Sequence, residues 1–465
     1  MFYILVFSIL FLSGCQGNGG HVIELLQSGT GMDVGPWVNL VSLEPFRVCI
    51  TWLSAIPKSF VVMTGWDAEH LDEELKPTSD GVVHRVYVDV PCEKTLYYQV
   101  KPDLECCSGE VFSISAPPSS DSLKIAVLGD MQPRDDSTLQ SNRLMLDAVR
   151  RVAPDLVIQV GDILERGSEI KNWGFLMQVL PQLASGVPMA LVPGNHDLKY
   201  DEGANWDLGF GQTFIDGLDG RHRILRQGNI RFFMLEAFYG PLSTHDYEWL
   251  SRELLKAQEE ACWRFVFFHG SIISTGTENT DIELQRQLVP LFDQTKVHAV
   301  FYGHDHFYEH YQVSYGPWLF NPKDRPTGHM VHYFLTGGGG ARLEHEYGLL
   351  ERPEKVRKQV FVNAETHKRK TFRFGRRPWN PNRVNTLADP GWAINGQACY
   401  QVCSEECYQD DAVFWGHEYG ENVLHYITLE IGKDEASVEV HYPDGSLLTG
   451  PAGDNPQSFL INRLT

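Results

Sequence analysis

The sequence predicts an α/β fold whose larger part is built on parallel strands, with a small all-β domain before it. Five runs of mostly apolar residues are long enough for buried parallel strands, and each is followed by polar residues. The stretches between the runs contain amphipathic patterns such as Leu284, Leu288 and Leu291, which are typical of helices that cover a sheet. Residues 36–117 show a different pattern, that of short alternating strands.

Length and composition are those of a globular protein. With 465 residues the chain is long enough for two or three domains, and 43% hydrophobic and 21% charged residues are ordinary values for folded domains. The formal net charge of −21 argues against a nonspecific hold on nucleic acid, because that binding depends on Lys and Arg neutralising phosphates.

The first residues have the pattern of an export signal. Residues 2–12 form an apolar run that is too short to cross a bilayer as a helix, and Leu-Ser-Gly-Cys15 ends it. This resembles a bacterial lipoprotein signal peptide, which implies a signal at residues 1–15, a lipid on Cys15, a tether at residues 16–35 and a place in the cell envelope. No Lys or Arg precedes the run, and a cleaved ordinary signal or a buried strand are the alternatives.

Residues 36–117 predict a β-sandwich. Turn residues interrupt the alternation at the spacing expected of that fold, and residues 116–121, rich in Pro and Ser, predict a linker to a domain that begins at residue 122. The expected strand residues are Val48, Ile50, Trp52, Val61, Met63, Val86, Val88, Val90, Leu96, Tyr98 and Val100, with Val111 and Ile114 less regular.

Metal-ligand residue types follow each of the five apolar runs. Because the carboxyl ends of parallel strands meet at one edge of a sheet, these residues are expected to lie together. Carboxylates, amides and imidazoles suit Mn, Fe or Zn. The runs are residues 123–128, 156–160, 189–192, 265–268 and 299–302, and the residues that follow are Gly129-Asp130-Met131-Gln132, Gly161-Asp162, Asn195-His196, His269 and Gly303-His304-Asp305-His306.

These blocks, in this order, resemble the calcineurin-like metallophosphoesterases, and the match is specific because all of them occur jointly between Gly129 and His306. The resemblance implies a domain at residues 122–465 in which a β-sandwich is flanked by helices and a dinuclear metal centre hydrolyses phosphate esters. Residues 51–54 and 94–98 are similar to the fibronectin-III-like domain that precedes the catalytic domain of purple acid phosphatases. The β-domain is therefore expected to be of that type.

The family pattern implies a role for each candidate ligand. Asp162 matches the bridging position, because one carboxylate can hold two ions about 3.5–4 Å apart. Gln132 stands where the family more often has His, and it is a weaker, neutral ligand. Taken singly, a strand-end Asp is more often a helix cap and a His more often a core residue. The pattern gives one ion to Asp130, Gln132 and His306, and the other to Asn195, His269 and His304.

His196 is expected to act as the general acid. Its neighbour Asn195 takes the ligand position, and the resemblance places His196 against the leaving-group oxygen, where an imidazole can donate a proton. Asp197 is expected to orient the ring through its other nitrogen, and the alternative is that it caps a helix. A metal-bound hydroxide would be the nucleophile.

One position departs from the purple acid phosphatases. They carry a Tyr three residues after the bridging Asp, and that position here is Glu165. Without the tyrosinate a ferric centre loses its purple chromophore. We therefore expect the two-domain architecture of that branch, but neither its colour nor its iron assignment.

Residues 344–420 lack clean periodicity and predict an insertion before final strands at residues 425–431 and 437–442. Between Arg352 and Arg383 the insertion carries eleven Lys or Arg against two acids. Its run at 368–377, which is interleaved with aromatic residues, is expected to be a solvated flap. Contact with an anionic substrate, a membrane surface or nucleic acid is the alternative.

Two further patterns have a structural interpretation. Residues 337–340 are four glycines after an apolar run, and they predict a tight turn rather than a phosphate cradle, because neither Lys-Ser/Thr nor a helix pattern follows. Eight cysteines besides Cys15 permit disulfides in an exported protein. Cys399, Cys403 and Cys407 predict a disulfide-pinned loop rather than a metal site.

The complete set of candidate ligands, together with His196, favours an enzyme over a surface binding protein that has kept the fold without turnover. The motifs serve phosphomonoesterases and phosphodiesterases alike. The substrate, the identity of the metal and the oligomeric state are therefore left open by the sequence.

Overall fold

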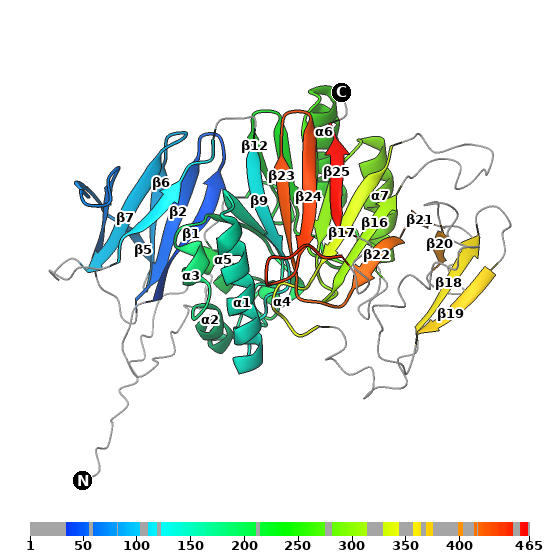
Figure 1. Ribbon diagram of the computed structural model, residues 1–465, viewed down its shortest axis with the longest axis horizontal. Helices are drawn as coiled ribbons and strands as arrows, with labels where there is room; N and C mark the ends of the chain where they lie inside the picture. The colour runs from blue at the N-terminus through cyan, green and yellow to red at the C-terminus, as the bar shows by residue number, and fades with distance from the viewer. Residues whose placement is uncertain are drawn as a thin grey trace, which may run out of the picture.

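The computed structural model describes residues 34–54, 59–80, 82–102, 110–118, 122–210, 214–274, 281–313, 329–343, 357–363, 369–374, 399–402, 413–415, 417–449 and 456–463. Two large β-sheets pack face to face, and helices lie against the outer face of each (Figure 1). The expected α/β fold with a sandwich flanked by helices is confirmed.

The first large sheet has ten strands in the order β25-β24-β23-β9-β10-β11-β1-β2-β6-β5. Its strands are β1 (Val34–Ser42), β2 (Arg47–Leu53), β5 (Thr78–Asp80), β6 (Val83–Asp89), β9 (Leu123–Leu128), β10 (Leu156–Val160), β11 (Met189–Val192), β23 (Tyr426–Ile431), β24 (Glu435–His441) and β25 (Ser458–Asn462). Strands β9, β10 and β11 are parallel, and β23 pairs with the other edge of β9 in the antiparallel sense.

The second large sheet has seven strands in the order β12-β13-β14-β15-β17-β16-β22. Its strands are β12 (Arg223–Gln227), β13 (Ile230–Met234), β14 (Trp263–Phe267), β15 (Ala299–Tyr302), β16 (Tyr308–Val313), β17 (Val331–Thr336) and β22 (His417–Glu421). Strands β13, β14, β15 and β17 are parallel. The apolar run expected at residues 265–268 begins two residues after the start of β14 and ends one residue after its end. The other four expected runs coincide with β9, β10, β11 and β15.

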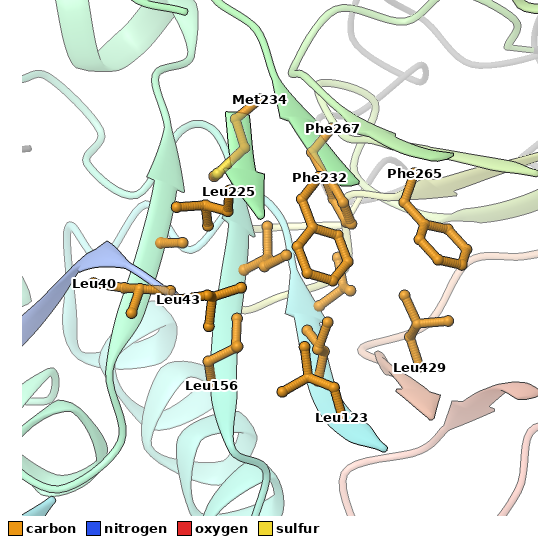
Figure 2. Close-up of a cluster of buried hydrophobic side chains, with 14 of the residues drawn as sticks. Leu40, Leu43, Leu123, Leu156, Leu225, Phe232, Met234, Phe265, Phe267 and Leu429 are labelled. Atoms are coloured by element: carbon orange, nitrogen blue, oxygen red, sulfur yellow. The ribbon is translucent and has the colours of Figure 1, made fainter. Parts of the chain in front are cut away.

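The main core lies between the two sheets. Leu123, Leu156 and Leu429 of the first sheet face Phe232 and Phe265 of the second (Figure 2). Successive residues of β9 alternate between this core and the helical side, where Ala126 and Leu128 pack. The parallel strands β10, β11, β14 and β15 are likewise buried along their whole length, which explains why they appear in the sequence as nearly continuous apolar runs.

The helices cover the outer faces of the sheets. Asp135 caps the first helix of the larger domain by accepting a hydrogen bond from the Thr138 amide, and it ends the loop that follows β9. The helices against the first sheet are α1 (Asp136–Val152), α2 (Ile170–Leu176), α3 (Pro181–Ala184) and α5 (Ala204–Phe210), with the single turn α4 (Asn195–Leu198) after β11. Those against the second sheet are α6 (Thr244–Glu259) and α7 (Ile282–Gln294).

The N-terminal strands are joined to the larger domain through backbone pairing. Asn39 of β1 pairs in parallel with Met189 of β11, so four N-terminal strands extend the ten-stranded sheet. The other four form a sheet of their own in the order β4-β3-β7-β8, with bounds β3 (Phe60–Gly65), β4 (Glu73–Leu75), β7 (Thr95–Pro102) and β8 (Phe112–Ser115). The domain boundaries and the fibronectin-III-like type stay predictions.

One N-terminal strand presents the opposite face from the one expected. In β3 the buried side chains are Phe60, Val62 and Thr64, whereas Val61 and Met63 are only partly buried. The pattern of the sequence misled because all of residues 60–63 are apolar, so the alternation does not distinguish the two faces.

The insertion contains a small sheet in the order β19-β18-β20-β21. Its strands are β18 (Arg357–Asn363), β19 (Arg369–Phe374), β20 (Cys399–Val402) and β21 (Val413–Trp415). Only the backbone is described for Cys399 and for the strand residues of the basic run, so their side chains lie outside the described part of the structure. Cys403, Cys407 and the N-terminal segment with Cys15 lie outside the described residues altogether. Among the described residues Cys49, Cys92 and Cys262 are free thiols. No helix in the described part of the chain is long and apolar enough to span a bilayer.

Candidate metal centre

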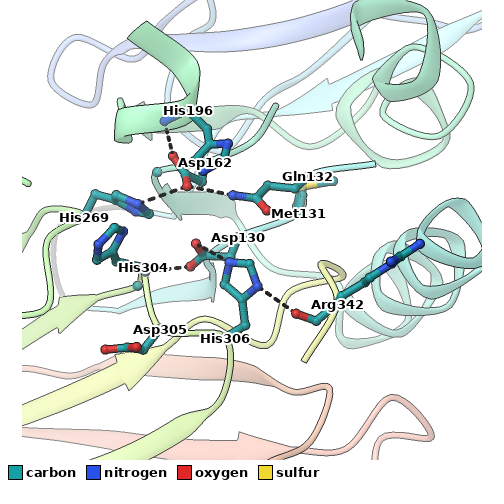
Figure 3. Close-up of polar contacts among 12 residues, drawn as sticks. Asp130, Met131, Gln132, Asp162, His196, His269, His304, Asp305, His306 and Arg342 are labelled. Carbon is teal, nitrogen blue, oxygen red and sulfur yellow. Dashed lines mark hydrogen bonds and ion pairs between the residues drawn. The ribbon is translucent and has the colours of Figure 1, made fainter. Parts of the chain in front are cut away.

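Both sheets contribute to one site, at the edge where the carboxyl ends of their parallel strands meet. Strands β9, β10 and β11 of the first sheet lead to Asp130, Asp162 and Asn195. Strands β14 and β15 of the second lead to three imidazoles. Figure 3 shows His269, His304 and His306 gathered around the carboxylates of Asp130 and Asp162.

The backbone at this edge is bent sharply. Asp130, Gln132, Asp162 and His304 have φ angles of 54°, 36°, 54° and 77°, in the left-handed region that residues with a side chain rarely adopt. Such conformations cost roughly 1–3 kcal/mol each and cluster at functional sites. A side chain at Gly194 would collide with the carboxylate of Asp162, so this approach of β11 to the loop after β10 requires glycine.

The carboxylate of Asp162 contacts three other residues of the site. Its Oδ1 accepts a hydrogen bond from the His196 amide at 2.9 Å, and its Oδ2 accepts one from Nε2 of Gln132 at 2.7 Å. The same Oδ2 lies 3.3 Å from Nε2 of His269. Ligand atoms of Asp162, His269 and His304 all lie within 4.8 Å of one another.

Backbone carbonyls fix the orientation of two imidazoles. Nδ1 of His269 donates to the carbonyl of Val160 at 3.0 Å, and Nδ1 of His306 donates to the carbonyl of Arg342 at 2.7 Å. In each neutral ring the lone pair is then on Nε2, the atom that faces the carboxylates. Nε2 of His269 points at Oδ1 of Asn195, 3.1 Å away, and at Asp162.

Asp130 occupies the other half of the site. Its Oδ2 accepts a hydrogen bond from the His304 amide at 3.0 Å, and its Oδ1 lies 3.4 Å from Nε2 of His306. The residue is fully buried, and its Oδ1 has no hydrogen-bond partner. A buried carboxylate oxygen without a hydrogen bond is costly unless a cation satisfies it.

The electrostatics of the site pair buried acids with buried imidazoles. Burial alone would raise the pKa of Asp162, but the charges of His269 and His196 outweigh it and hold that pKa below its ordinary value. Burial would lower the pKa of His269, whereas Asp162 and Asp130 raise it to about 9. Burial raises the pKa of Asp130, and burial together with the charge of His269 lowers the pKa of His304 to about 4.

The donor set fits a pair of metal cations. Carboxylate, amide and imidazole donors converge at this site, and the proton that the acids draw onto His269 is the positive charge that a cation would replace. The residues expected as ligands, Asp130, Gln132, Asp162, Asn195, His269, His304 and His306, all lie at this edge. Their binding of metal stays a prediction.

His196 lies beside the acids, but Asp197 does not orient it as the sequence led us to expect. Nδ1 of His196 donates instead to the carbonyl of Glu165 at 2.6 Å. Asp197 is fully buried, and its carboxylate accepts hydrogen bonds from the amides of Gly194 and Leu164, both at 2.9 Å. The capping alternative is closer to the structure, because Asp197 closes the turn that begins at Gly194.

Asp197 therefore acts on His196 only through the backbone. It fixes Leu164, the residue before the carbonyl that holds the imidazole. Burial and the neighbouring Asp162 raise the pKa of Asp197 to about 8. The side chain of Glu165, which stands in the place of the tyrosine, is 3.0 Å from the guanidinium of Arg134.

The four-glycine segment closes against the loop that carries Asp130. The amide of Gly339 donates to the carbonyl of Gly129 at 2.9 Å, and the amide of Ala341 donates to the carbonyl of Asp130 at 2.8 Å. The segment bends at residues 339–341, and because these two amides already donate to backbone carbonyls they do not form a phosphate cradle. A side chain at Gly339 would collide with the carbonyl of Gly129.

Sequence reasoning missed one residue at the rim. Tyr239 follows β13, and its ring centroid lies 5.7 Å from that of His304. Strand β13 gives the same apolar signal as the other five runs, but no cluster of metal-ligand types follows it. An aromatic residue in a loop carries no sign of its function without the tertiary structure.

Comparisons with known proteins agree with this geometry. Residues 123–308 match the family described as "Calcineurin-like phosphoesterase". Purple acid phosphatase 21 of Arabidopsis thaliana is 26% identical over 278 residues, which cover 57% of this chain and 60% of that protein. Purple acid phosphatase 22 of the same plant is 22% identical over 332 residues, which cover 67% of this chain and 72% of that protein. The match thus spans less than two thirds of the first relative.

Solved structures show the same fold. A purple acid phosphatase from seeds of yellow lupin (Lupinus luteus) superposes with a TM-score of 0.62 at 15% identity, over 93% of this chain and 75% of that one. PhoD superposes with a TM-score of 0.52 at 11% identity, over 90% of this chain and 87% of that one. Residues 123–308 therefore match the calcineurin-like phosphoesterase family, and the chain is similar to purple acid phosphatases in its sequence and in its fold.

Proposed function

We propose that the protein is a hydrolase of phosphate esters that depends on two metal ions. The observation that carries the proposal is the convergence of Asp130, Asp162 and His269 with the other donors at one sheet edge, with Nδ1 of two imidazoles already engaged by carbonyls. The homology to purple acid phosphatases supports it. When bound, the ions supply an activated water and neutralise charge on the phosphate.

Two residues of the chain have separate roles in this proposal, one in holding the metal ions and one in proton transfer. We assign to Asp162 the carboxylate that would hold both ions, and the support is that the Gln132 side chain and the His196 amide fix the directions of its two oxygens. His196 is the proton donor to the leaving group. Its Nδ1 proton is held by the carbonyl of Glu165, so in the cationic ring the proton on Nε2 is the one that can be transferred.

Replacing His196 by Ala tests this assignment. We expect the turnover number to fall roughly 10²–10⁴-fold, as for the loss of a general acid, with metal content near that of the wild type. The assay uses a panel of phosphomonoesters and phosphodiesters, which also decides between the two substrate classes. His70→Ala, at an exposed histidine of the N-terminal strands, is the matched control and should keep full activity. A His196→Ala enzyme with full turnover would contradict the role, and a wild type inactive on every ester would contradict the function.

We further propose that the protein is exported and anchored by a lipid on Cys15. The support is the apolar run at residues 2–12 that ends at that cysteine. The partners that follow from these proposals are a phosphate-ester substrate and a membrane surface.

A further inference from the structure

The loop that carries Tyr239 is held firmly at both ends. The carbonyl of Ala237 accepts hydrogen bonds from the amides of His269 and Gly270, at 3.3 and 2.8 Å. On the other side, the amide of Gly240 donates to Oδ2 of Asp281 at 2.6 Å, and Asp281 is the N-cap of α7. The backbone of Tyr239 is thus fixed relative to His269, one of the candidate ligands.

The side chain of Tyr239 is nevertheless exposed. It keeps 65% of its accessible surface, although the residues around it belong to a buried site. Its ring meets His304 and Phe238 edge to face, with interplanar angles of 82° in both cases and centroid distances of 5.7 and 5.5 Å. An aromatic ring with fixed backbone and open surface beside a reaction site is a preorganised platform for another planar group.

The rim offers a surface of a different kind from the inner site. Under the proposed function the metal ions would bind the phosphate of a substrate, and the phenol ring of Tyr239, which lies against His304, adds uncharged apolar surface next to it. A substrate with a phosphate and an attached aromatic ring fills both parts. Each aromatic contact of this kind contributes roughly 5- to 150-fold to the affinity of other proteins that stack bases on aromatic side chains.

We propose that Tyr239 is a specificity-determining residue that stacks on the aromatic group of the substrate, so that the preferred esters carry an aryl ring or a nucleobase next to the phosphate. This inference rests on the proposed function, since it names the substrate class of the same site. Tyr239 acts by direct contact with the substrate and takes no part in proton transfer.

Matched pairs of esters separate stacking from reactivity. Adenosine 5′-monophosphate and ribose 5-phosphate share a primary 5′-hydroxyl leaving group and differ in the base, whereas phenyl phosphate and cyclohexyl phosphate compare an aryl with an alkyl ring. For Tyr239→Ala we expect kcat/KM to fall roughly 10- to 100-fold for the aromatic member of a pair and less than about 2-fold for the other. The two pairs distinguish a nucleobase from a simple aryl group.

Two variants serve as controls. Tyr239→Phe keeps the ring and should retain the preference, because stacking does not need the hydroxyl. Trp66→Ala removes another exposed aromatic residue, 54% accessible and in the N-terminal strands, and should leave all four values unchanged. Equal losses for both members of each pair in Tyr239→Ala, or no loss at all, would overturn the inference.

A binding measurement keeps the inference testable even if the wild type turns over no ester. Phenylphosphonate and methylphosphonate are non-hydrolysable, and their affinities are measured by calorimetry on the metal-loaded protein. We expect the wild type to bind phenylphosphonate roughly 10-fold or more tightly than Tyr239→Ala does, with methylphosphonate unaffected. Absence of ester hydrolysis with this difference present would reject the proposed function alone, whereas equal affinities of the two proteins for phenylphosphonate would reject the stacking role.

Discussion

Asp162 shows how much of the geometry a single residue can control. It lies at a positive φ of 54°, and its two oxygens contact the side chain of Gln132, the amide of His196 and the ring of His269. Replacing Asp162 would therefore remove contacts of three neighbouring residues at once. The proposed bridging role and the positions of the neighbouring side chains therefore depend on the same carboxylate.

Replacement of Asp162 by Ala should therefore remove both ions together. A bridge holds two ions, and its loss also frees Gln132 and His269 from their present positions. We expect metal content, measured by mass spectrometry after desalting, to fall for both equivalents. Asp147→Ala, an exposed acid of α1 paired with Arg150, is the control and should keep its metal. Two ions retained in Asp162→Ala would rule out the bridge.

At the scale of elements, the site depends on how the loops after the strands pack together. The segment Gly337–Gly340 follows β17 and bonds to the loop after β9, although these loops are far apart in the chain. The absence of side chains lets the two backbones approach closely. The turn thereby holds Asp130 in place from outside the site.

Gly339→Ala should loosen this contact. The added methyl group would meet the carbonyl of Gly129, so we expect a loss of about 1–3 kcal/mol in the free energy of unfolding and weaker metal retention. Denaturant unfolding and metal analysis measure both. Gly174→Ala is the matched control: nothing lies within 4 Å of that position in α2, and Ala should stabilise the helix by about 0.5–1 kcal/mol. Equal stability of both variants would show that the turn does not position the loop.

A strand could be predicted from the sequence where a short, nearly continuous apolar run is enough to identify it. Strands β9, β10, β11 and β15 match their apolar runs because both faces are buried. The polar residues after them come together because the strand ends share an edge. The partner of His196 could not be predicted, because Glu165 offers a backbone carbonyl, and every residue has one. The role of Tyr239 and the pairing of β1 with β11 likewise depend on contacts between distant segments.

At the scale of the whole molecule, burial disfavours the charged form of several histidines that are not candidate metal ligands. Burial lowers the pKa of His425 and of His332 to about 4, and burial holds that of His298 well below its ordinary value. His425 is fully buried, and it already uses both ring nitrogens, toward the carbonyl of Val423 and the hydroxyl of Thr336. A second ring proton would place a charge in the core.

These histidines should make the fold sensitive to acid. In the unfolded chain these histidines bind a proton below their ordinary pKa of 6.5, whereas in the folded chain they bind one only below about pH 4. The free energy of unfolding therefore falls as the pH drops from 6.5 to about 4. We expect the free energy of unfolding to decrease by roughly 1–2 kcal/mol per histidine between pH 6.5 and pH 5. The measurement is denaturant unfolding with a chelator present, so that metal binding does not contribute. His425→Gln should show a shallower dependence, and a slope equal to that of the wild type would contradict the role of His425.

The proposed anchor also concerns the whole molecule. Cys15→Ala should leave the protein in the soluble fraction, because the lipid is the membrane signal that we assign to the chain. The measurement is the distribution between membrane and soluble fractions of expressing cells. Cys92→Ala, at an exposed free cysteine, is the control and should fractionate as the wild type does. Unchanged membrane association of Cys15→Ala would point instead to the basic insertion or to an uncleaved leader.

The pairing of β9 with β23 has a consequence for biosynthesis. Strand β9, which leads to Asp130, lies between β10 and β23, and β23 is encoded about 300 residues later. At ordinary rates of translation the ribosome needs roughly 15–60 s to cover that distance. For this time the nascent chain carries a central strand with one bare edge, which can pair with other unfinished chains. A chaperone that shields the emerging polypeptide should therefore matter most to this protein before β23 has been made.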